Sequence, residues 1–209
     1  MAHMRPRRAI LCFGALLMSP TLASVALSKP QDLKPGEFIA GQLLVATPEM
    51  GDPRFSRTVI LMVQHNVKGA MGIVINRPIE DVPVSKLLDA LGLDSKGSDG
   101  TVTLFYGGPV EPQIGFVVHS TEYRRAGTIA IDDSVAMSSD PAVLRDIGRH
   151  EGPRQNLIAL GYAGWGPGQL EGEIAAGAWF TMPSNPQLVF EVERGRLWDE
   201  ATKRRVIPL

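Results

Sequence analysis

Long apolar runs separated by glycine- and proline-containing loops dominate the first half of the chain. Residues 38–47, 57–66 and 71–78 are rich in β-branched and aliphatic side chains and predict strands. Only the short segment VKGA separates the second run from the third, which predicts a hairpin. Because both runs are apolar nearly throughout, we expect both faces of these strands to be buried.

Helical periodicity first occurs in residues 84–91, where Val84, Leu87, Leu88 and Leu91 form an apolar stripe. A second helix, at 141–150, is indicated by Asp140 as N-cap followed by Pro141. Further strands are predicted at 101–108, 115–120, 128–133, 156–165, 178–183 and 187–192, and helices at 169–177 and 195–206. The pattern predicts about eight strands and about four short helices. Since strand pairs follow one another without intervening helices, the fold class is α+β, with one compact domain and a largely antiparallel or mixed sheet.

Residues 1–36 differ from the rest and are interpreted as a leader to a domain at 37–209. The first four residues, MAHM, resemble a cloning scar. Arg5, Arg7 and Arg8 then precede a short apolar run, with Ser24 and Ala26 suited to a cleavage site. This order predicts export to the periplasm; the alternative is a misassigned start codon or a disordered leader. The apolar run is too short for a transmembrane span, and no integral membrane segment is predicted in the body.

Charge and composition exclude several classes of protein. The 209 residues carry a formal net charge of −1, which becomes −4 without the arginine-bearing residues 1–26. Neither value favours a protein that binds nucleic acid with its whole surface. The single cysteine, Cys12, lies in the leader, so the body has no thiol chemistry, disulfide or cysteine-based metal site. Motifs for nucleotide, dinucleotide or calcium binding are missing, and the sequence indicates neither a cofactor nor a metal.

The segment GYAGWGPGQLEG, at 161–172, raises the question of a phosphate loop, because a glycine-rich turn leads into a helix. The loop contains no lysine or arginine, and Glu171 and Glu173 would repel a phosphate at the helix start. We therefore interpret the glycines as a sharp strand-to-helix turn beside Trp165.

Histidines and basic residues supply weaker candidates. His65 and His119 each end a predicted apolar strand, where a histidine serves as a base or simply marks the strand end. We expect no carboxylate or hydroxyl partner within reach of either ring. His150, at a helix end, is interpreted as structural. Basic residues at 194–196 and 203–205 on the last helix either contact nucleic acid or form a solvated face.

Several blocks resemble one family. The stretch from Gly41 to Pro78, the motif FYGGPV at 105–110, GFVVHS and GYAGWGPGQLEGEIAAGAW are similar to the AlgH/YqgE family, also called UPF0301 or DUF179. The resemblance covers roughly residues 37–200. It implies a small bacterial, cytoplasmic α+β protein with a regulatory role in alginate production and transcription. The family has no established biochemical activity, so no catalytic residue is carried over.

The blocks of the resemblance combine turn geometry with polar side chains at strand ends. If those ends converge, they form a pocket for a small polar or anionic ligand, lined by Asn76, Arg77, Tyr106, Tyr162, Trp165 and Gln169. The alternative is an internal Arg77–Glu171 ion pair with the aromatic rings in the core. The leading hypothesis is a non-enzymatic protein that binds a small ligand or a protein partner, with a regulatory role. The alternatives are a nucleic-acid-associated transcriptional regulator and a hydrolase that uses a strand-end histidine.

Overall fold

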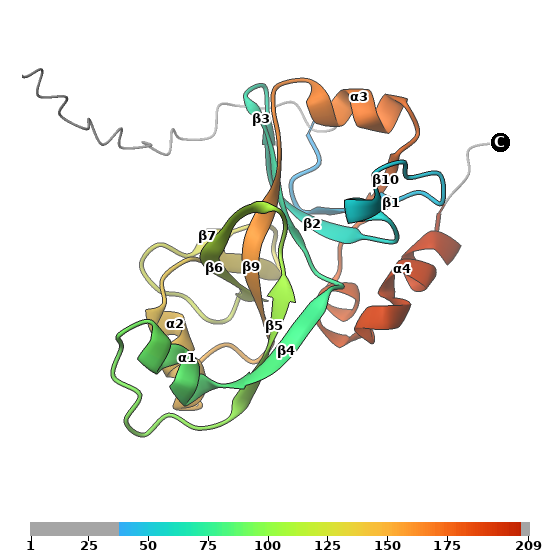
Figure 1. Cartoon of the computed structure of the whole chain (residues 1–209). Coiled ribbons are helices and arrows are strands. Elements are labelled where there is room, and N and C mark those ends of the chain that lie inside the picture. The colour runs from blue at the N-terminus through green and yellow to red at the C-terminus, as the bar shows by residue number, and fades with distance from the viewer. Residues whose placement is uncertain (1–37, 206–209) are drawn as a thin grey trace, which may run out of the picture. The chain divides into compact units, whose positions relative to one another are not determined.

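The computed structural model describes residues 38–205, which contain ten strands, four α-helices and two short helical segments of other types (Figure 1). The strands are β1 Gln42–Ala46, β2 Val59–Asn66, β3 Gly69–Val74, β4 Pro78–Pro83, β5 Thr101–Tyr106, β6 Val110–Ser120, β7 Ile129–Ala130, β8 Val135–Ser138, β9 Asn156–Trp165 and β10 Trp179–Pro183. The helices are α1 Val84–Ala90, α2 Ala142–Gly148, α3 Gln169–Ala175, α4 Arg194–Lys203, the 3-10 turn η1 Pro53–Phe55 and the π-helix η2 Gln187–Glu191. This arrangement confirms the α+β fold class. The predicted leader lies outside the described residues.

The strands form one sheet in the order β10-β1-β2-β3-β9-β6-β8-β7, and the β4–β5 ribbon joins it through β9. All of the pairs are antiparallel except that between β5 and β9, which is parallel. Strand β9 therefore contacts three neighbours: β5 along its first half, β6 from Asn156 to Tyr162, and β3 along its last residues (Figure 1). Within residues 38–205, no helix is long and apolar enough to cross a membrane.

A bend at Gly161 lets β9 change neighbours. The residue has a φ of +72°, a left-handed conformation that interrupts the extended backbone of the strand. Before the bend, Leu104 to Tyr106 pair with Ile158 to Leu160; after it, Ala70 to Gly72 pair with Ala163 to Trp165. An added Cβ at Gly161 would lie 2.5 Å from the carbonyl oxygen of Gly108. Both the dihedral angle and the close backbone approach therefore require glycine.

Both faces of the central strands are buried, as the apolar runs predict. In β1, Leu43 and Val45 pack into a cluster covered by η2 and α4, whereas Leu44 and Ala46 pack into a second cluster that includes Leu170 of α3. A third cluster joins α1 and α2 to the β5, β6 and β9 region (Figure 1). The sheet is thus covered by α3 on one face and by α4 and η2 on the other, with α1 and α2 at its far end.

The hairpin of β2 and β3, the strand at 156–165 and the helices at 84–91, 141–150, 169–177 and 195–206 are confirmed, with shifts at their ends. The prediction of a strand at 187–192 is wrong, because this segment forms η2. Asn185 Oδ1 accepts the backbone N–H of Leu188 at 2.9 Å, which starts the helical turn. Leu188 and Val189 of η2 are both fully buried in the cluster beneath α4, so a helical turn buries the same apolar run.

The strand predicted at 128–133 is shorter in the structure and is followed by a second strand. Only Ile129 and Ala130 form β7, after which Asp132 Oδ1 accepts the backbone N–H groups of Ser134 and Val135. This carboxylate-stabilised turn reverses the chain into β8. The sequence does not predict strand β4, since the segment PIEDVP has proline at both ends. In the structure this strand is largely exposed.

Replacing Gly161 tests the bend. We expect Gly161→Ala to lower the free energy of unfolding by about 3 kcal/mol, because alanine is strained at positive φ and its Cβ meets backbone atoms. Gly164→Ala is the matched control in the same strand, where the nearest atom to an added Cβ is 3.2 Å away on the Tyr162 ring. Urea denaturation followed by circular dichroism measures both. Equal losses in the two variants would contradict the assignment of the bend to Gly161.

Candidate functional site

A groove with a volume of about 760 Å³ lies along one face of the β4–β5 ribbon. Strand β5 places Thr101, Thr103 and Phe105 on this face, because side chains two apart in a strand point the same way. The cross-strand neighbour Asp81 lies on the same face, since its Oδ1 accepts the Thr103 hydroxyl at 2.6 Å. The floor of the groove is therefore a strip of hydroxyls and a carboxylate that ends on an aromatic ring.

Two distant segments form the walls. One wall is the junction of η2 and α4, with Phe190, Glu191, Glu193 and Arg194. The other lining residues are Asp99 before β5, His150 after α2 and Asn156 at the start of β9, where the neighbouring Gln155 donates to Glu191 of the first wall. The parallel pairing of β5 with β9 brings the start of β9 beside β5, and the contact of Arg194 with Phe105 brings the η2–α4 junction to the same strand, although these segments are far apart in the sequence.

The groove is acidic. Its four carboxylates each have a partner: Asp81 has Thr103, Asp99 has His150 at 2.7 Å, Glu191 has the Gln155 amide at 3.0 Å, and Glu193 caps α4 by accepting the N–H groups of Gly195 and Arg196. Three of these partners are neutral groups. The partners hold the carboxylates in place while leaving their charge largely uncompensated.

Arg194 offsets part of this charge, because its guanidinium is attracted to the neighbouring carboxylate of Glu193. Its guanidinium donates to the carbonyl oxygens of Val189 at 2.7 Å and Phe190 at 2.6 Å, and it lies 5.7 Å from the centre of the Phe105 ring. Burial lowers the pKa of this guanidinium. Arg194 therefore ties α4 to η2 and closes the apolar end of the groove.

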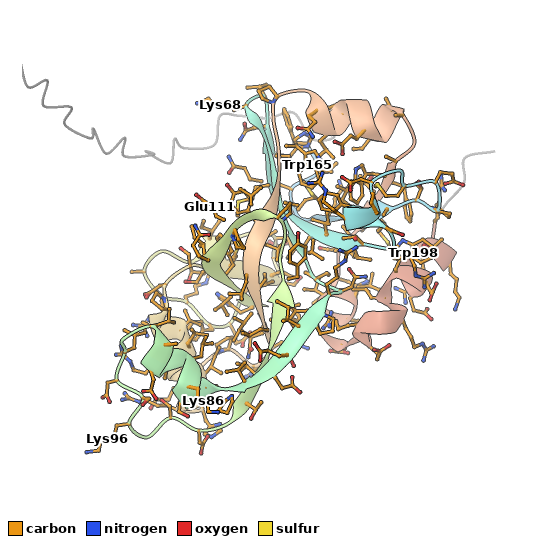
Figure 2. All side chains as sticks on the ribbon, viewed as in Figure 1. Lys68, Lys86, Lys96, Glu111, Trp165 and Trp198 are labelled. Carbon is orange, nitrogen blue, oxygen red and sulfur yellow. The ribbon has the colours of Figure 1, made fainter. Side chains whose placement is uncertain are left out.

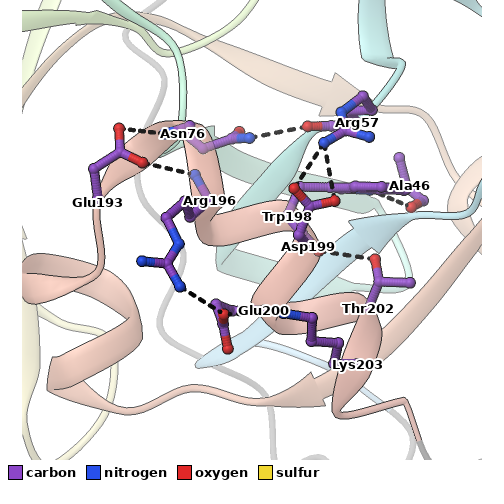
Figure 3. A network of polar contacts seen from close by, with 11 residues as sticks. Ala46, Arg57, Asn76, Glu193, Arg196, Trp198, Asp199, Glu200, Thr202 and Lys203 are labelled. Carbon is purple, nitrogen blue, oxygen red and sulfur yellow. Dashed lines mark hydrogen bonds and ion pairs between the residues drawn. The ribbon is translucent and has the colours of Figure 1, made fainter.

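The side chains predicted to line a pocket lie in separate groups. Asn76 Oδ1 accepts the N–H of Val59 at 2.9 Å. Its Nδ2 donates to the carbonyl oxygen of Arg57 at 2.9 Å (Figure 3). Arg77 donates to the carbonyl oxygen of Ser56 and to the hydroxyl of Thr58. Tyr106 is joined to this group through its backbone N–H, which donates to the carbonyl oxygen of Arg77 at 2.9 Å. These contacts hold the chain between η1 and β2 against the end of β3.

Trp165 and Gln169 belong to a different group, centred on Glu173. Glu173 Oε2 accepts the indole N–H of Trp165 at 2.9 Å and that of Trp179 at 2.8 Å, while Oε1 accepts the Gln169 amide at 2.9 Å. Trp165 is buried beneath α3, in the same cluster as Trp179 and Leu170 (Figure 2). The glycine-rich turn thus brings α3 down onto two tryptophans, and Gln169 Oε1 also accepts the N–H of Gly166.

Register separates the two groups. Ala70 of β3 lies opposite Trp165, and Asn76 is six residues further along the chain, about 20 Å at the rise of a strand. Tyr162 lies between them, packed edge-to-face on Phe116 at 6.2 Å. None of the six residues lines the groove on β5. Ligand binding by these side chains stays a prediction.

His65 has a carboxylate partner, so the expectation that neither strand-end histidine has one is wrong. Its Nε2 lies 3.0 Å from Oε1 of Glu171, and its Nδ1 accepts the N–H of Ile39 at 3.3 Å. The alternative of an Arg77–Glu171 ion pair is also wrong. Arg77 donates to Ser56 and Thr58, whereas Glu171 contacts His65. With both ring nitrogens engaged, His65 holds residue 39 and α3 together, and this geometry does not favour a role as a base.

His119 is fully buried in β6. Its Nδ1 lies 2.9 Å from the carbonyl oxygen of Ser120, which assigns the proton to Nδ1. Its ring packs edge-to-face on Tyr123 at 5.4 Å. Within residues 38–205, its Nε2 has no hydrogen-bond partner. Among these residues, no hydroxyl or carboxylate bonds to the ring, in agreement with the expectation for this histidine.

The basic residues of α4 are largely engaged within the protein. Arg196 and Lys203 both pair with Glu200, at 3.5 and 3.3 Å (Figure 3). Arg205 lies over the Phe180 ring at 5.2 Å, and the Arg194 guanidinium is bonded to backbone carbonyls. These contacts reduce the charge that the helix presents to a nucleic acid.

Sequence reasoning does not identify the groove. The alternation in TVTLFY places Thr101, Thr103 and Phe105 on one face, and this signal is present in the sequence. The wall at 190–194 is missed because the sequence pattern predicts a strand there.

The fold and its glycine-containing turns define a class of small α+β proteins, and comparison with known proteins identifies it. A family profile described as AlgH-like (DUF179) matches residues 43–209. The chain therefore belongs to this family, whose members are also called UPF0301 proteins.

Relatives of this chain span most of its length. It is 46% identical over 154 residues to a UPF0301 protein of Rhodospirillum rubrum, covering 74% of this chain and 80% of the relative. It is 43% identical to a UPF0301 protein of Methylococcus capsulatus, covering 87% of this chain and 100% of the relative. The solution structure of the AlgH protein from Pseudomonas aeruginosa matches with a TM-score of 0.68 and 34% identity, covering 85% of this chain and 94% of that one. A crystal structure from Corynebacterium diphtheriae, at 23% identity and a TM-score of 0.64, shares the fold; the match covers 81% of this chain and 88% of that one.

The carboxylate that joins the two tryptophans is testable by substitution. We expect Glu173→Leu to lower the free energy of unfolding by about 2 kcal/mol, because two indole N–H groups lose their acceptor. Glu173→Gln keeps one carbonyl acceptor and is expected to lose less. Urea denaturation followed by circular dichroism ranks the three proteins. A leucine variant as stable as the parent would contradict the role of Glu173.

Glu171 predicts a pH dependence. The hydrogen bond from its own backbone N–H, followed by the contact with His65, lowers the pKa of this carboxyl below 4.5. Because the pKa is lower in the folded than in the unfolded state, the ionised carboxylate stabilises the protein at a pH above the unfolded-state pKa. This stabilisation is lost as the pH falls through the folded-state pKa. We expect the stability difference between the parent and Glu171→Gln to shrink below about pH 4.5 in urea titrations. A difference that stays constant into acid would exclude this linkage.

Proposed function

We propose that this AlgH-like protein is a non-enzymatic binding protein that holds a positively charged segment of a protein partner in the groove on β5. The observation that carries the proposal is the set of four carboxylates around a groove of about 760 Å³. A regulatory role would then be exerted through the bound partner. The groove is large enough for several side chains of an extended segment.

The lining suits lysine and arginine side chains. Their aliphatic stems cover apolar surface such as Phe105 and Phe190, while the charged heads reach carboxylates at the rim. Thr101 and Asn156 offer hydrogen bonds to the backbone of the segment. The negative charge of the groove also attracts a basic partner and increases the association rate. Salt screens this attraction.

The same charge disfavours nucleic acid at this face. A phosphate backbone would meet Asp81, Asp99 and Glu191, with the guanidinium of Arg194 turned toward backbone carbonyls. Together with the ion pairs of α4, this favours a protein partner over the nucleic-acid alternative. The hydrolase alternative is disfavoured because both ring nitrogens of His65 are engaged.

Fluorescence anisotropy with two labelled peptides tests the proposal. One peptide carries arginine and leucine, and the other has the same length with glutamate in place of arginine. We expect the basic peptide to bind, and the double variant Asp81→Asn/Glu191→Gln to weaken that binding about tenfold, since two charge pairs are removed. Both substitutions keep an oxygen that accepts the existing hydrogen bonds.

The matched control is Glu49→Gln/Glu111→Gln, which removes the same charge from exposed residues outside the groove. It is expected to leave the affinity within twofold of that of the parent at equal salt. A twofold change in affinity corresponds to about 0.4 kcal/mol of binding free energy. The proposal fails if the acidic peptide binds equally well, or if control and groove variants weaken binding alike.

A further inference from the structure

A second, smaller cavity lies beside the loop between β6 and β7. It has a volume of about 130 Å³ and is lined by Thr121, Arg124, Arg125, Thr128, Ala130 and Ala136. Two consecutive arginines and two hydroxyls thus meet over a floor of small side chains. This composition contrasts with the acidic groove and indicates a different ligand.

The loop is fixed by a polar network on α2. Tyr123 donates its hydroxyl proton to Asp146 Oδ2 at 2.6 Å, and Arg125 Nη1 pairs with the same oxygen. Burial and this hydrogen bond raise the pKa of Tyr123 to about 12, so it stays neutral. The charge of Arg125 is balanced by Asp146, with Asp140 at 3.9 Å from Nε. These contacts order the cavity before any ligand binds.

Arg124 differs from its neighbour. Within residues 38–205, its guanidinium has no hydrogen-bond or ion-pair partner, although it lines the cavity. Thr128 Oγ1 accepts the backbone N–H of Arg125 at 3.1 Å, which leaves the hydroxyl proton available for a ligand. Thr121 donates its proton to the carbonyl oxygen of Asp133 and so contributes only an acceptor. The cavity therefore offers a charged fork and one hydroxyl as donors.

We propose that this cavity binds a phosphate-sized oxyanion through the Arg124 guanidinium and the Thr128 hydroxyl. A planar guanidinium donates two parallel N–H bonds to such an anion, and the volume accommodates a single tetrahedral group. The anion is either free phosphate or the phosphoryl group of a small molecule, and the two share this chemistry.

Titration of the isotope-labelled protein with inorganic phosphate, followed by amide chemical shifts at constant ionic strength, tests the proposal. We expect saturable shifts in residues 121–130 and an affinity about tenfold lower in Arg124→Gln. Arg149→Gln removes the same charge from an exposed residue outside the cavity and is expected to leave the affinity unchanged. Thr128→Val is expected to weaken binding, and Thr128→Ser to restore it.

Phosphoserine serves as the second probe. Tighter binding of phosphoserine than of inorganic phosphate would assign the site to a phosphorylated small molecule, and the reverse to free phosphate; both support the site. Shifts that do not saturate, that centre elsewhere, or that are identical in the Arg124 and Arg149 variants would overturn it. Since Arg124 is exposed, its substitution is not expected to unfold the protein.

Discussion

The left-handed bend at Gly161 determines how the two halves of the sheet are joined. Strand β9 pairs with β5 before this residue and with β3 after it, while its pairing with β6 continues to Tyr162, so one strand belongs to both halves. The groove on β5 lies beside the first half of β9, and the second half leads into the glycine-rich turn and α3. The bend therefore separates the acidic groove from the tryptophan-containing turn.

The contacts of α3 explain the glycine-rich turn. The turn brings α3 back over the sheet, where Glu173 accepts both indole N–H groups and the amide of Gln169. The Glu173 carboxylate thus has three hydrogen-bond donors within the protein. These bonds secure a helix that is too short to be stable alone. Glu171, the other carboxylate of this helix, is bonded to His65. Both acidic side chains that argue against a phosphate loop thus have structural partners.

Much of the fold is predictable because local pattern and burial agree. The β2–β3 hairpin and the strand at 156–165 are continuous apolar runs bounded by turn residues, and burial on both faces selects that pattern. The segment at 187–192 misleads the prediction, since Leu188 and Val189 reach the same core from a π-helix as they would from a strand. The groove is beyond sequence reasoning for a different reason. Residues 78–81, 99–105 and 190–194 are joined by the antiparallel pairing of β4 with β5 and by the contact of Arg194 with Phe105, which are long-range contacts that leave no local signal.

In the function proposed for this protein, partner binding belongs to the groove on β5, whereas the tryptophan-containing turn is structural. Mapping the amide chemical-shift changes of the labelled protein at saturation with a basic peptide tests this division of roles. We expect the largest changes on residues 99–105 and 190–194, with residues 164–173 unchanged. Changes centred on 164–173 would contradict this division and assign the binding function to the glycine-rich turn.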